Sequence, residues 1–546
     1  MIQSRLAGLD QTPLDAVVIG GGMAGAGIAR DLALRGVSVA LFEKGDFASG
    51  TSSKSSKLIH GGLRYLELGD FKLVRESLRE RKTLERVAPH LVRSLPFLVP
   101  VYKGSRRGLV LVRLGMWLYD LLTPGKATER YRVLRAVDTL ALEPNIRPED
   151  LKGAGYYFDD LLLYPERMCL ENVLSAARHG ARVFNYCQVE EFLKDARGLD
   201  GVRVRDLLTD QVFDVRASVV INASGPWVDR VRELAGLPGA PPRVVRTTKG
   251  IHCLLPRLTE RAVYLSSDSD ERMIFVIPWR DFSLVGTTDT DFDGDPDRLW
   301  ATRGEVEYLL AAVRRVLPDP RVSLEHVAYT YAGVRPLAFE EGAVASRVSR
   351  DHRVVLEGNE GRLMSVTGTK LTCFRSLAEE VGDLVAARLH RRQPSVSARL
   401  SLDGLDEDVA KLEARAWLDV SAEMAATGLP RDTLQILVDT YGRGYTRVLE
   451  LAKKFPDGAE RLCPSNPEIV AQLHQAVREE MAVSLQDFLI RRTAIGQSLC
   501  QGLDCAESIG RRMADVAGWS SRRLSAELEA YQKHVDRSHR FRQPAS

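Results

Sequence analysis

Short apolar runs alternate with helical patterns over the larger part of the chain. Between Asp15 and about His390, β-branched runs are separated by segments that repeat apolar residues at three- and four-residue spacing. Such alternation is typical of α/β and α+β proteins. The clearest predicted strands are Ala16–Ile19, Val37–Phe42, Ser218–Asn222, Met273–Pro278 and Ser283–Gly286.

The pattern changes after the basic, proline-containing stretch Arg391–Ser397. Beyond this stretch, apolar residues recur at helical spacing and strand signals become rare, which predicts an all-α domain. We therefore expect two regions, residues 14–390 and residues 398–540. The helices predicted in the second region are Ala410–Met424, Arg431–Tyr441, Pro467–Val483 and Ser521–Val535.

The segment Leu109–Leu122 is apolar almost throughout. It is shorter than the roughly 18 apolar residues that a membrane-spanning helix needs, and no other stretch of the sequence reaches that length. The favoured interpretation is a helix buried in the core. The alternative is a helix on a membrane surface, where aromatic and basic side chains meet the interface. The side chains that fit this alternative are Arg106, Arg107, Arg113, Trp117 and Tyr119.

Size and charge narrow the class of protein. The chain has 546 residues, of which 45% are hydrophobic, so it can bury a large cofactor within two or three domains. Its 76 Lys and Arg residues balance 73 Asp and Glu residues, giving a net charge of +3. This balance gives no support for a nucleic-acid partner, and any anion site must be local.

The seven cysteines are scattered along the sequence. None forms a CxxC pair or belongs to a Cys/His cluster with the spacing of a metal site. The residues Met1–Pro13 are polar and lack the apolar stretch of a signal peptide. We therefore expect a reduced, cytosolic chain with no structural zinc and no metal in its active site.

A glycine motif follows the first predicted strand directly, in the pattern Gly20-x-Gly22-x-x-Gly25. Gly20 allows a tight turn, Gly22 lets a pyrophosphate approach the backbone, and Gly25 lets the next helix pack closely on the strand. The phosphates then lie at the helix N-terminus, with Met23 among the residues expected to contact them. The motif predicts a dinucleotide-binding domain.

Glu43 ends the second predicted strand, where a carboxylate accepts hydrogen bonds from a ribose diol. This residue disfavours an NADP-type cofactor and leaves FAD or NAD. Two further segments favour FAD, because an NAD domain explains neither. Asn222–Trp227 resembles a turn that flavoprotein oxidases and disulfide reductases place near FAD, and Met364–Thr372 joins a strand to a helix through a glycine turn. The cofactor contacts expected from them are Ser224, Gly225, Trp227, Gly368 and Lys370.

The segment Ala48–Glu67 is rich in small and hydroxyl-bearing residues and contains a His-Gly-Gly turn. Hydroxyls and backbone N–H groups suit cofactor phosphates and ring edges. The residues expected to contact the cofactor here are Thr51, Ser52, Ser56 and Lys57. Cations that could hold an anionic substrate are Arg64, Arg335, Arg350 and Lys370.

Taken together, these segments resemble the family of FAD-dependent glycerol-3-phosphate dehydrogenases. The run from Ser55 to Glu67, Ser-Ser-Lys-Leu-Ile-His-Gly-Gly-Leu-Arg-Tyr-Leu-Glu, is the most specific part, and Asp487–Thr493 also looks like the family's Arg-Arg-Thr segment. The resemblance implies a Rossmann-type FAD-binding domain of the amino-acid-oxidase or glutathione-reductase kind, an interleaved β-rich substrate domain and an all-α C-terminal domain. Further segments that carry it are Gly20–Glu43, Asn222–Trp227, Lys249–His252, Gly286–Asp289, Gly333–Leu337 and Thr367–Thr372.

By position, the resemblance implies that glycerol 3-phosphate is oxidised to dihydroxyacetone phosphate by hydride transfer to FAD. The substrate phosphate would be held by Arg64, Tyr65, Arg335 and Arg350. His60 is the expected base, because a neutral imidazole can accept a proton near pH 7. Arg335 would stabilise the developing alkoxide or fix the phosphate, and Lys370 would lie near the flavin and the reacting carbon. Thr369 departs from the family, which usually has glycine before the lysine.

The resemblance also implies a quinone as electron acceptor and peripheral association with the cytosolic face of a membrane, and it allows a homodimer. An oxidase that uses O₂ would share every motif. The same scaffold would also serve an amine or amino-acid oxidase, or a non-catalytic flavin-bound redox sensor or interaction protein.

Overall fold

The first sheet of the computed structural model grows outward from β1 (Leu14–Ile19). This strand pairs in parallel with β2 (Val39–Phe42) on one side and β10 (Val212–Asn222) on the other. The full order is β17-β18-β10-β1-β2-β7, and an antiparallel extension of β8 and β9 joins the start of β10. The outer strands are β7 (Arg182–Phe184), β8 (Cys187–Asp195), β9 (Gly198–Asp206), β17 (Arg353–Glu357) and β18 (Leu363–Thr367). The structure describes residues 6, 8–9, 11–67, 69–123, 130–196, 198–267, 272–342, 351–358, 361–368, 370–410 and 426–543.

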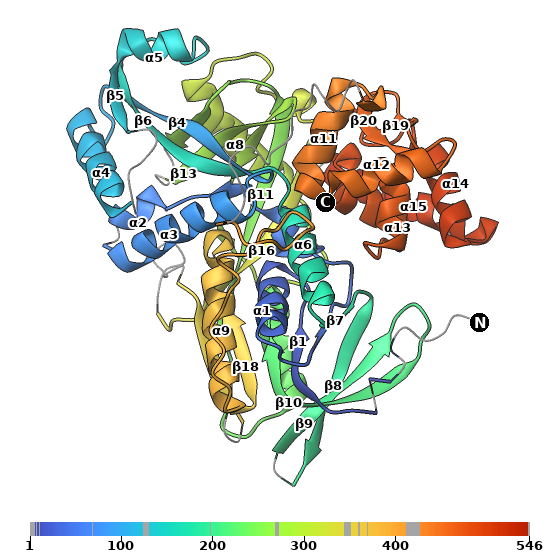
Figure 1. Ribbon diagram of the computed structural model, residues 1–546. Coiled ribbons are helices and arrows are strands. Elements are labelled where there is room, and N and C mark those ends of the chain that lie inside the picture. Colours follow the sequence, from blue (N-terminus) through green and yellow to red (C-terminus); the bar gives the residue numbers. More distant parts are fainter. Residues whose placement is uncertain are drawn as a thin grey trace.

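Helices cover this parallel sheet, as its continuous apolar strands require. The helix α1 (Met23–Leu34) packs between α6 (Pro165–Arg178) and α9 (Phe374–Arg388), and these helices lie beside β1 and β18 in Figure 1. Val18, Leu41 and Val219 are fully buried beneath them. This arrangement presents the N-terminus of α1 at the carboxyl end of β1, which is where such sheets bind ligands.

A second sheet forms the upper left of Figure 1 and holds a separate apolar core. The chain crosses between the two sheets repeatedly, since β3 to β6 and β11 to β16 belong to the second sheet while the intervening strands belong to the first. Its strands are β3 (Leu58–Ile59), β4 (Val92–Tyr102), β5 (Arg132–Arg135), β6 (Leu151–Leu162), β11 (Val245–Pro256), β12 (Ala262–Ser266), β13 (Met273–Trp279), β14 (Phe282–Gly286), β15 (Thr290–Asp291) and β16 (Tyr329–Ala338). The helices in this part and beside it are α2 (Leu63–Glu67), α3 (Phe71–Val87), α4 (Leu109–Leu122), α5 (Ala136–Leu142) and α8 (Arg303–Val316), whereas α7 (Val228–Ala235) packs against β8, β10 and β18 of the first sheet. The predicted interleaved domain is therefore confirmed.

The C-terminal region is helical, as predicted, and lies at the upper right of Figure 1. The predicted helices Arg431–Tyr441 and Ser521–Val535 correspond to α11 (Arg431–Tyr441) and α15 (Ser521–Ser538). The remaining elements are α12 (Tyr445–Lys454), α13 (Val470–Arg478), α14 (Ala506–Ala517) and the hairpin of β19 (Arg461–Cys463) and β20 (Asn466–Ile469). The helix predicted at Ala410–Met424 lies outside the described residues except for its first residue.

One predicted helix in this region, Pro467–Val483, was too long at both ends. Pro467 does not begin a helix but lies in β20, because Asn466 pairs with Cys463 across a tight hairpin. The helix begins only at Val470 and ends at Arg478. A proline is compatible with either the first turn of a helix or an edge strand, so its position alone did not distinguish them.

A buried ion-pair network fastens the helical domain to the first sheet. Asp46 accepts hydrogen bonds from Arg491 at 2.6 Å and from Arg492 at 2.8 and 2.9 Å. Burial alone would raise the pKa of Asp46, but the Arg492 and Arg491 guanidiniums hold it at about 2. The segment Asp487–Thr493 thus has a structural role, because removing one partner would leave a buried charge unpaired.

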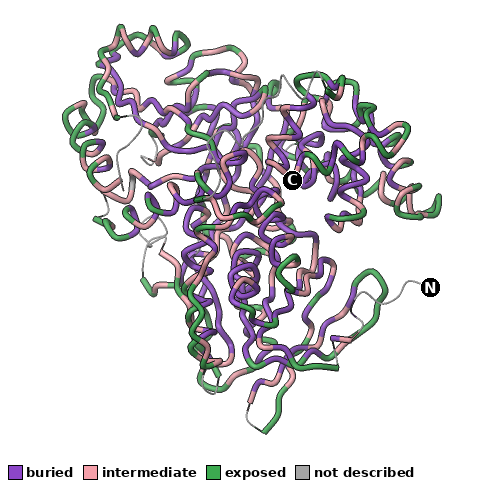
Figure 2. Tube along the Cα trace, viewed as in Figure 1, coloured by how far each residue is buried: buried purple, intermediate pink, exposed green. Residues whose placement is uncertain are grey.

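The helix α4 contradicts the favoured interpretation of a core segment. Only one side of it is buried, through Val112, Met116 and Tyr119. The other side exposes five large apolar residues, and much of α4 is coloured as exposed in Figure 2. These residues are Val110, Leu111, Leu114, Trp117 and Leu121. Within the described part of the chain, no helix is long and apolar enough to cross a membrane.

Candidate functional site

A cavity of about 1010 Å³ lies where the two sheets and the C-terminal helices meet. Its walls come from segments that are far apart in the sequence, including the α1 N-terminus, the turn after β3, β16 and the turn after β18. Most residues predicted for the site line this one cavity. They are Gly20, Gly22, Met23, Glu43, Thr51, Ser52, Ser56, His60, Tyr65, Ser224, Gly225, Trp227, Arg335, Gly368 and Lys370.

Two glycines of the predicted motif leave no room for a side chain. Gly20 has φ +105°, and a Cβ there would lie 2.6 Å from the carbonyl oxygen of Ala223. A Cβ on Gly25 would lie only 1.9 Å from the carbonyl oxygen of Gly20. Gly22 is more open, since Ser52 Oγ at 3.1 Å is the single close neighbour of a Cβ built there. The motif therefore forms the close turn and leaves its middle glycine facing open space, which suits a pyrophosphate.

The N-terminus of α1 opens into the cavity beside a hydroxyl. The backbone N–H of Met23 donates to Ser52 Oγ at 2.9 Å. Backbone N–H groups at a helix start lack partners within the helix, and the helix dipole favours negative charge there. Ser52 is therefore placed, together with the first turn of α1, where a cofactor phosphate is expected.

Glu43 lies at the cavity edge directly after β2. Its Oε2 accepts the N–H of Gly21 at 2.7 Å, and its Oε1 accepts the N–H of Gly45 at 2.8 Å. Burial raises the pKa of this carboxyl, and the two N–H groups oppose that shift. These bonds fix the orientation of a carboxylate whose remaining lone pairs suit a ribose diol.

Across the cavity, Lys370 holds the turn that carries His60. Its Nζ donates to the backbone carbonyl of His60 at 2.7 Å and to Ser77 Oγ at 2.8 Å. The same ammonium lies 5.0 Å above the ring of Tyr65, whose ring centroid is 6.5 Å from that of His60. Three residues predicted from two distant motifs therefore meet in one place.

The Arg335 side chain projects from β16 into space that is free because residue 250 on the neighbouring strand is a glycine. A Cβ on Gly250 of the neighbouring strand would lie 2.3 Å from Arg335 Nη2. The guanidinium donates to Thr287 Oγ1 at 2.7 Å and pairs with Asp289 at 3.2 Å. An oriented and partly neutralised guanidinium on the cavity wall is suited to binding one anionic group.

His252 is a cavity residue that the predicted site omitted. Its ring stacks on Tyr331 with centroids 4.9 Å apart, and its Nε2 lies 2.8 Å from Ser56 Oγ. Burial, followed by the charges of Arg335 and Lys57, lowers the pKa of this imidazole well below its usual value. The ring is therefore neutral at physiological pH. The segment Lys249–His252 already belonged to the family resemblance, so a sequence signal for this residue existed.

The C-terminal helix α15 also reaches the cavity, through His534 and Arg537. His534 Nε2 lies 3.1 Å from the hydroxyl of Tyr329, and burial lowers the pKa of His534 to about 3. Lys54 lines the same wall, and burial lowers its pKa to about 8. The sequence of α15 resembles that of an ordinary amphipathic helix, so it gave no sign that His534 and Arg537 would reach the cavity.

Other predicted residues lie away from the cavity wall or outside the described part of the chain. The Lys57 side chain is buried away from the cavity wall, with its Nζ 4.6 Å above the Trp279 ring and 3.8 Å from Glu166, so its predicted cofactor contact is not supported. Gly25 acts through packing beneath the wall. Arg64 belongs to α2, but its side chain is outside the described part of the chain, and so are Arg350 and Thr369.

Known protein families and individual relatives match this chain along almost its whole length. A sequence model of the family described as FAD dependent oxidoreductase matches residues 15–370, and one described as the C-terminal domain of alpha-glycerophosphate oxidase matches residues 371–524. The glycerol-3-phosphate dehydrogenase of Synechocystis sp. is 38% identical, over 97% of this chain and 98% of the relative. The aerobic glycerol-3-phosphate dehydrogenase of Staphylococcus aureus is 35% identical, over 96% of this chain and 94% of the relative.

A solved structure of a glycerol-3-phosphate dehydrogenase also resembles this chain over its full length. The X-ray structure of the glycerol-3-phosphate dehydrogenase from Bacillus halodurans complexed with FAD has a TM-score of 0.82 and 29% identity, and the match covers 100% of this chain and 98% of that one. The glycine motif, the α1 N-terminus and Glu43 fit the dinucleotide part of that cofactor. The chain therefore belongs to the FAD-dependent oxidoreductases, in the group that contains the glycerol-3-phosphate dehydrogenases, and FAD is its cofactor.

Proposed function

We propose that the protein oxidises sn-glycerol 3-phosphate to dihydroxyacetone phosphate and passes the electrons to a membrane quinone. The observation that carries this proposal is the meeting of His60, Tyr65 and Lys370 on the wall of the cavity that Arg335 also lines. A cavity with several cations suits a phosphorylated substrate better than the carboxylate and apolar side chain of an amino acid. The names of the relatives support the same substrate.

Bound FAD supplies the acceptor for the hydride that leaves C2 of the substrate. The protein's own groups have two other tasks, which are to hold the phosphate and to take the proton from the C2 hydroxyl. We assign the phosphate to Arg335 and Tyr65, with Arg64 and Arg350 as further contacts implied by the family resemblance. A guanidinium already oriented by Thr287 and Asp289 loses little freedom on binding, which favours it as the anchor.

We assign proton removal to His60. Its backbone is fixed on both sides, because its carbonyl accepts from Lys370 and its N–H donates to Thr372 Oγ1 at 3.1 Å. The ring itself is half-buried and faces the cavity beside Tyr65. His252 is less suited to this step because its ring is buried against Tyr331 and bonded to Ser56. Its role is to position Ser56 at the cavity wall.

The helix α4 is the proposed contact with the membrane. A quinone resides in the bilayer, so the enzyme must reach the membrane surface. Val110 is 84% exposed and Trp117, two helical turns further on the same side, is 51% exposed, and such a row of exposed large apolar side chains is typical of a contact surface. The inner side of the same helix reaches the active-site turn, since the Gly61 N–H donates to the Tyr119 hydroxyl at 2.8 Å. Binding at the cytosolic face remains a prediction.

An O₂-using oxidase is the second candidate. It is favoured by one observation, the match of residues 371–524 to a domain described from alpha-glycerophosphate oxidase. The two candidates share the substrate site and differ only in the acceptor of the electrons.

The test compares substrates and acceptors on one preparation of the purified protein. We expect reduction of an artificial dye with glycerol 3-phosphate, little reduction with glycerol, and faster electron transfer to a soluble quinone analogue than to O₂. Equal rates with glycerol would contradict the cationic pocket. Rapid peroxide formation with negligible quinone reduction would establish the oxidase.

A further inference from the structure

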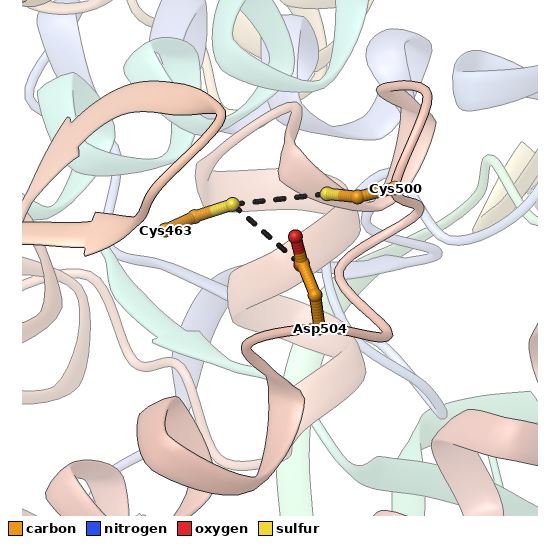
Figure 3. Close-up of side chains that lie close together, drawn as sticks. All are labelled: Cys463, Cys500 and Asp504. Atoms are coloured by element: carbon orange, nitrogen blue, oxygen red, sulfur yellow. Dashed lines mark hydrogen bonds between the residues drawn. The ribbon is translucent and has the colours of Figure 1, made fainter.

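Three cysteines that are scattered in the sequence gather in the C-terminal domain. Cys463 ends β19, whereas Cys500 and Cys505 lie in the turns before α14. Figure 3 shows the side chains of Cys463, Cys500 and Asp504 pointing toward one another, the first from the hairpin and the other two from the turns before α14. Cys505 is close enough to Cys463 to interact with it electrostatically. The expectation of no structural zinc considered sequence spacing only, and the fold brings together residues 37 positions apart.

The distances in this cluster fit one tetrahedral ion. Two thiolates bound to Zn²⁺ at about 2.3 Å stand roughly 3.8 Å apart, whereas a disulfide needs about 2.0 Å. The two sulfurs are separated by 3.7 Å, and Cys463 Sγ lies 3.7 Å from Asp504 Oδ1. One ligand atom from each of Cys463, Cys500 and Asp504 lies within 4.8 Å of the others.

A buried amide supports these sulfurs as ligands. Asn466 is 2% exposed, and its Nδ2 lies 3.0 Å from Cys463 Sγ and 3.4 Å from Cys500 Sγ. Its Oδ1 lies 3.5 Å from an Arg280 nitrogen, which fixes the amide with its N–H groups toward the sulfurs. The N–H of Gly502 also donates to Cys500 Sγ at 3.4 Å. Such donors stabilise metal-bound thiolates and set their orientation.

We propose that Cys463, Cys500 and Asp504 bind one zinc ion, with Cys505, which interacts with Cys463, as the candidate ligand for the fourth position. Two thiolates and one carboxylate bound to Zn²⁺ leave one negative charge, and a Cys505 thiolate would add a second. The Arg280 guanidinium, which contacts the supporting Asn466 amide, offsets part of this charge. Sulfur ligands favour zinc over magnesium or calcium. Asp504 is exposed and Cys500 is half-buried, so the ion can enter from solvent.

The ion would connect the hairpin to the part of the domain that reaches the cavity. Cys463 belongs to the hairpin, while Cys500 directly precedes Gln501, whose carbonyl accepts the Tyr531 hydroxyl of α15 at 2.7 Å. The same helix brings His534 and Arg537 to the cofactor cavity. The zinc therefore has a structural role, and it stabilises the folded domain because the unfolded chain holds no formed site.

The test measures metal on the intact FAD-loaded protein. Elemental analysis of protein purified under reducing conditions without chelators should give about one zinc per chain, as expected for a single structural site. After removal of the zinc, titration with Co²⁺ should produce a thiolate-to-cobalt absorption band that saturates at the same ratio. Zinc should also raise the thermal unfolding midpoint of the stripped protein.

Matched variants locate the site. Cys500→Ala and Asp504→Asn should each weaken Co²⁺ binding by at least tenfold, at the lower end of the roughly 10–100-fold that even outer-shell changes cause. Cys253→Ala, in the buried second sheet, and Asp515→Asn, on the exposed side of α14, should bind Co²⁺ like the parent. Flavin content serves as the check on folding. A reduced parent that holds no zinc and gives no cobalt band would overturn the proposal, and so would a Cys463–Cys500 disulfide or unchanged binding in both ligand variants.

Discussion

The ammonium of Lys370 donates a hydrogen bond to the backbone carbonyl of His60 at 2.7 Å, across 310 positions of sequence. The contact joins the turn after β18 of the first sheet to the turn after β3 of the second sheet. Because Lys370 is only 8% exposed, its charge is stabilised mainly by this carbonyl, Ser77 and the Tyr65 ring. The two sheets thus share one small polar contact beside the proposed reaction centre.

Lys370→Met should lower kcat/KM for glycerol 3-phosphate by roughly 10- to 100-fold, since hydrogen bonds to charged groups contribute about 1.5–3 kcal/mol. The variant removes the shorter of two hydrogen bonds to the His60 carbonyl, leaving only Thr372 Oγ1 at 3.3 Å, and it removes the donor to Ser77 Oγ, so the turn that carries the His60 ring is held less firmly. Dye-linked assays measure the rate, and flavin absorbance reports cofactor content. Lys72→Met, at an exposed ammonium 3.9 Å from Asp351, is the control. A parent-like rate would show that the contact has no role in catalysis.

Gly25→Ala should prevent the protein from retaining FAD. The added methyl would lie 1.9 Å from the Gly20 carbonyl oxygen, so the turn at which we expect the pyrophosphate to bind must move. Flavin released by denaturation, measured per chain, gives the result. Gly115→Ala on α4 meets no atom within 4 Å and should keep its flavin while gaining about 0.5–1 kcal/mol of helix stability. A yellow Gly25→Ala protein with parent flavin content would contradict the close packing.

The glycine motif shows why this part of the site could be predicted. Its function depends on local backbone geometry, and Gly20, Gly22 and Gly25 lie within one turn, so sequence spacing carries the information. The predicted strands around it were confirmed for the same reason, because a buried parallel strand must be apolar along its length.

The residues that were missed depend on long-range packing. His534 and Arg537 reach the cavity because α15 folds back on β16, where Thr330 Oγ1 donates to the Ser538 carbonyl. No local pattern encodes that contact. The wrong interpretation of Leu109–Leu122 as a core helix has a related cause. An apolar sequence indicates that the side chains avoid water, but it does not tell whether the protein core or another partner covers them.

Arg335→Ala should reduce kcat/KM for glycerol 3-phosphate by roughly 10- to 100-fold or more, from the loss of about 1.5–3 kcal/mol of charge-assisted binding. Arg335→Lys should recover only part of the loss, because one ammonium cannot reproduce the fork that contacts Thr287 and Asp289. Flavin content should remain at the parent level in both. Arg246→Ala removes a pair with the exposed Asp291 outside the cavity wall and should leave the rate unchanged. Equal losses of flavin and rate would instead indicate damage to the fold.

Stability should fall in mild acid partly because of His90. Burial lowers the pKa of His90 from 6.5 to about 3, so the folded chain keeps a neutral ring while the unfolded chain binds a proton below pH 6.5. A proton that only the unfolded chain binds favours unfolding, so the loss of unfolding free energy due to His90 grows as the pH falls from 6.5 toward about 3. Between about pH 7.5 and 5.5, His90 should account for about 1.4 kcal/mol of the decrease.

Denaturant unfolding at the two pH values tests this with His90→Gln, which cannot take up the proton. The difference in unfolding free energy between the two pH values should be smaller in the variant than in the parent by that amount. His326→Gln, at an exposed position, should keep the parent's difference. An unchanged pH dependence in His90→Gln would mean that this ring is already protonated or solvated in the folded chain.

The exposed side of α4 should determine membrane binding. Trp117 and Leu121 are 51% and 64% exposed and lie one helical turn apart, so both can enter the headgroup region together. Trp117→Glu with Leu121→Glu should reduce flotation with anionic liposomes by at least tenfold, because burying a large apolar side chain is worth about 1.5–3 kcal/mol and a carboxylate opposes it. Activity with glycerol 3-phosphate and a soluble dye should stay at the parent level, since both side chains face away from the buried Tyr119 contact with Gly61.

Leu208→Glu, in the turn between β9 and β10 and 43% exposed, controls for the added charge and should float like the parent. Unchanged flotation of the double variant would reject α4 as the docking surface, and a parent that fails to float at low salt would reject docking itself.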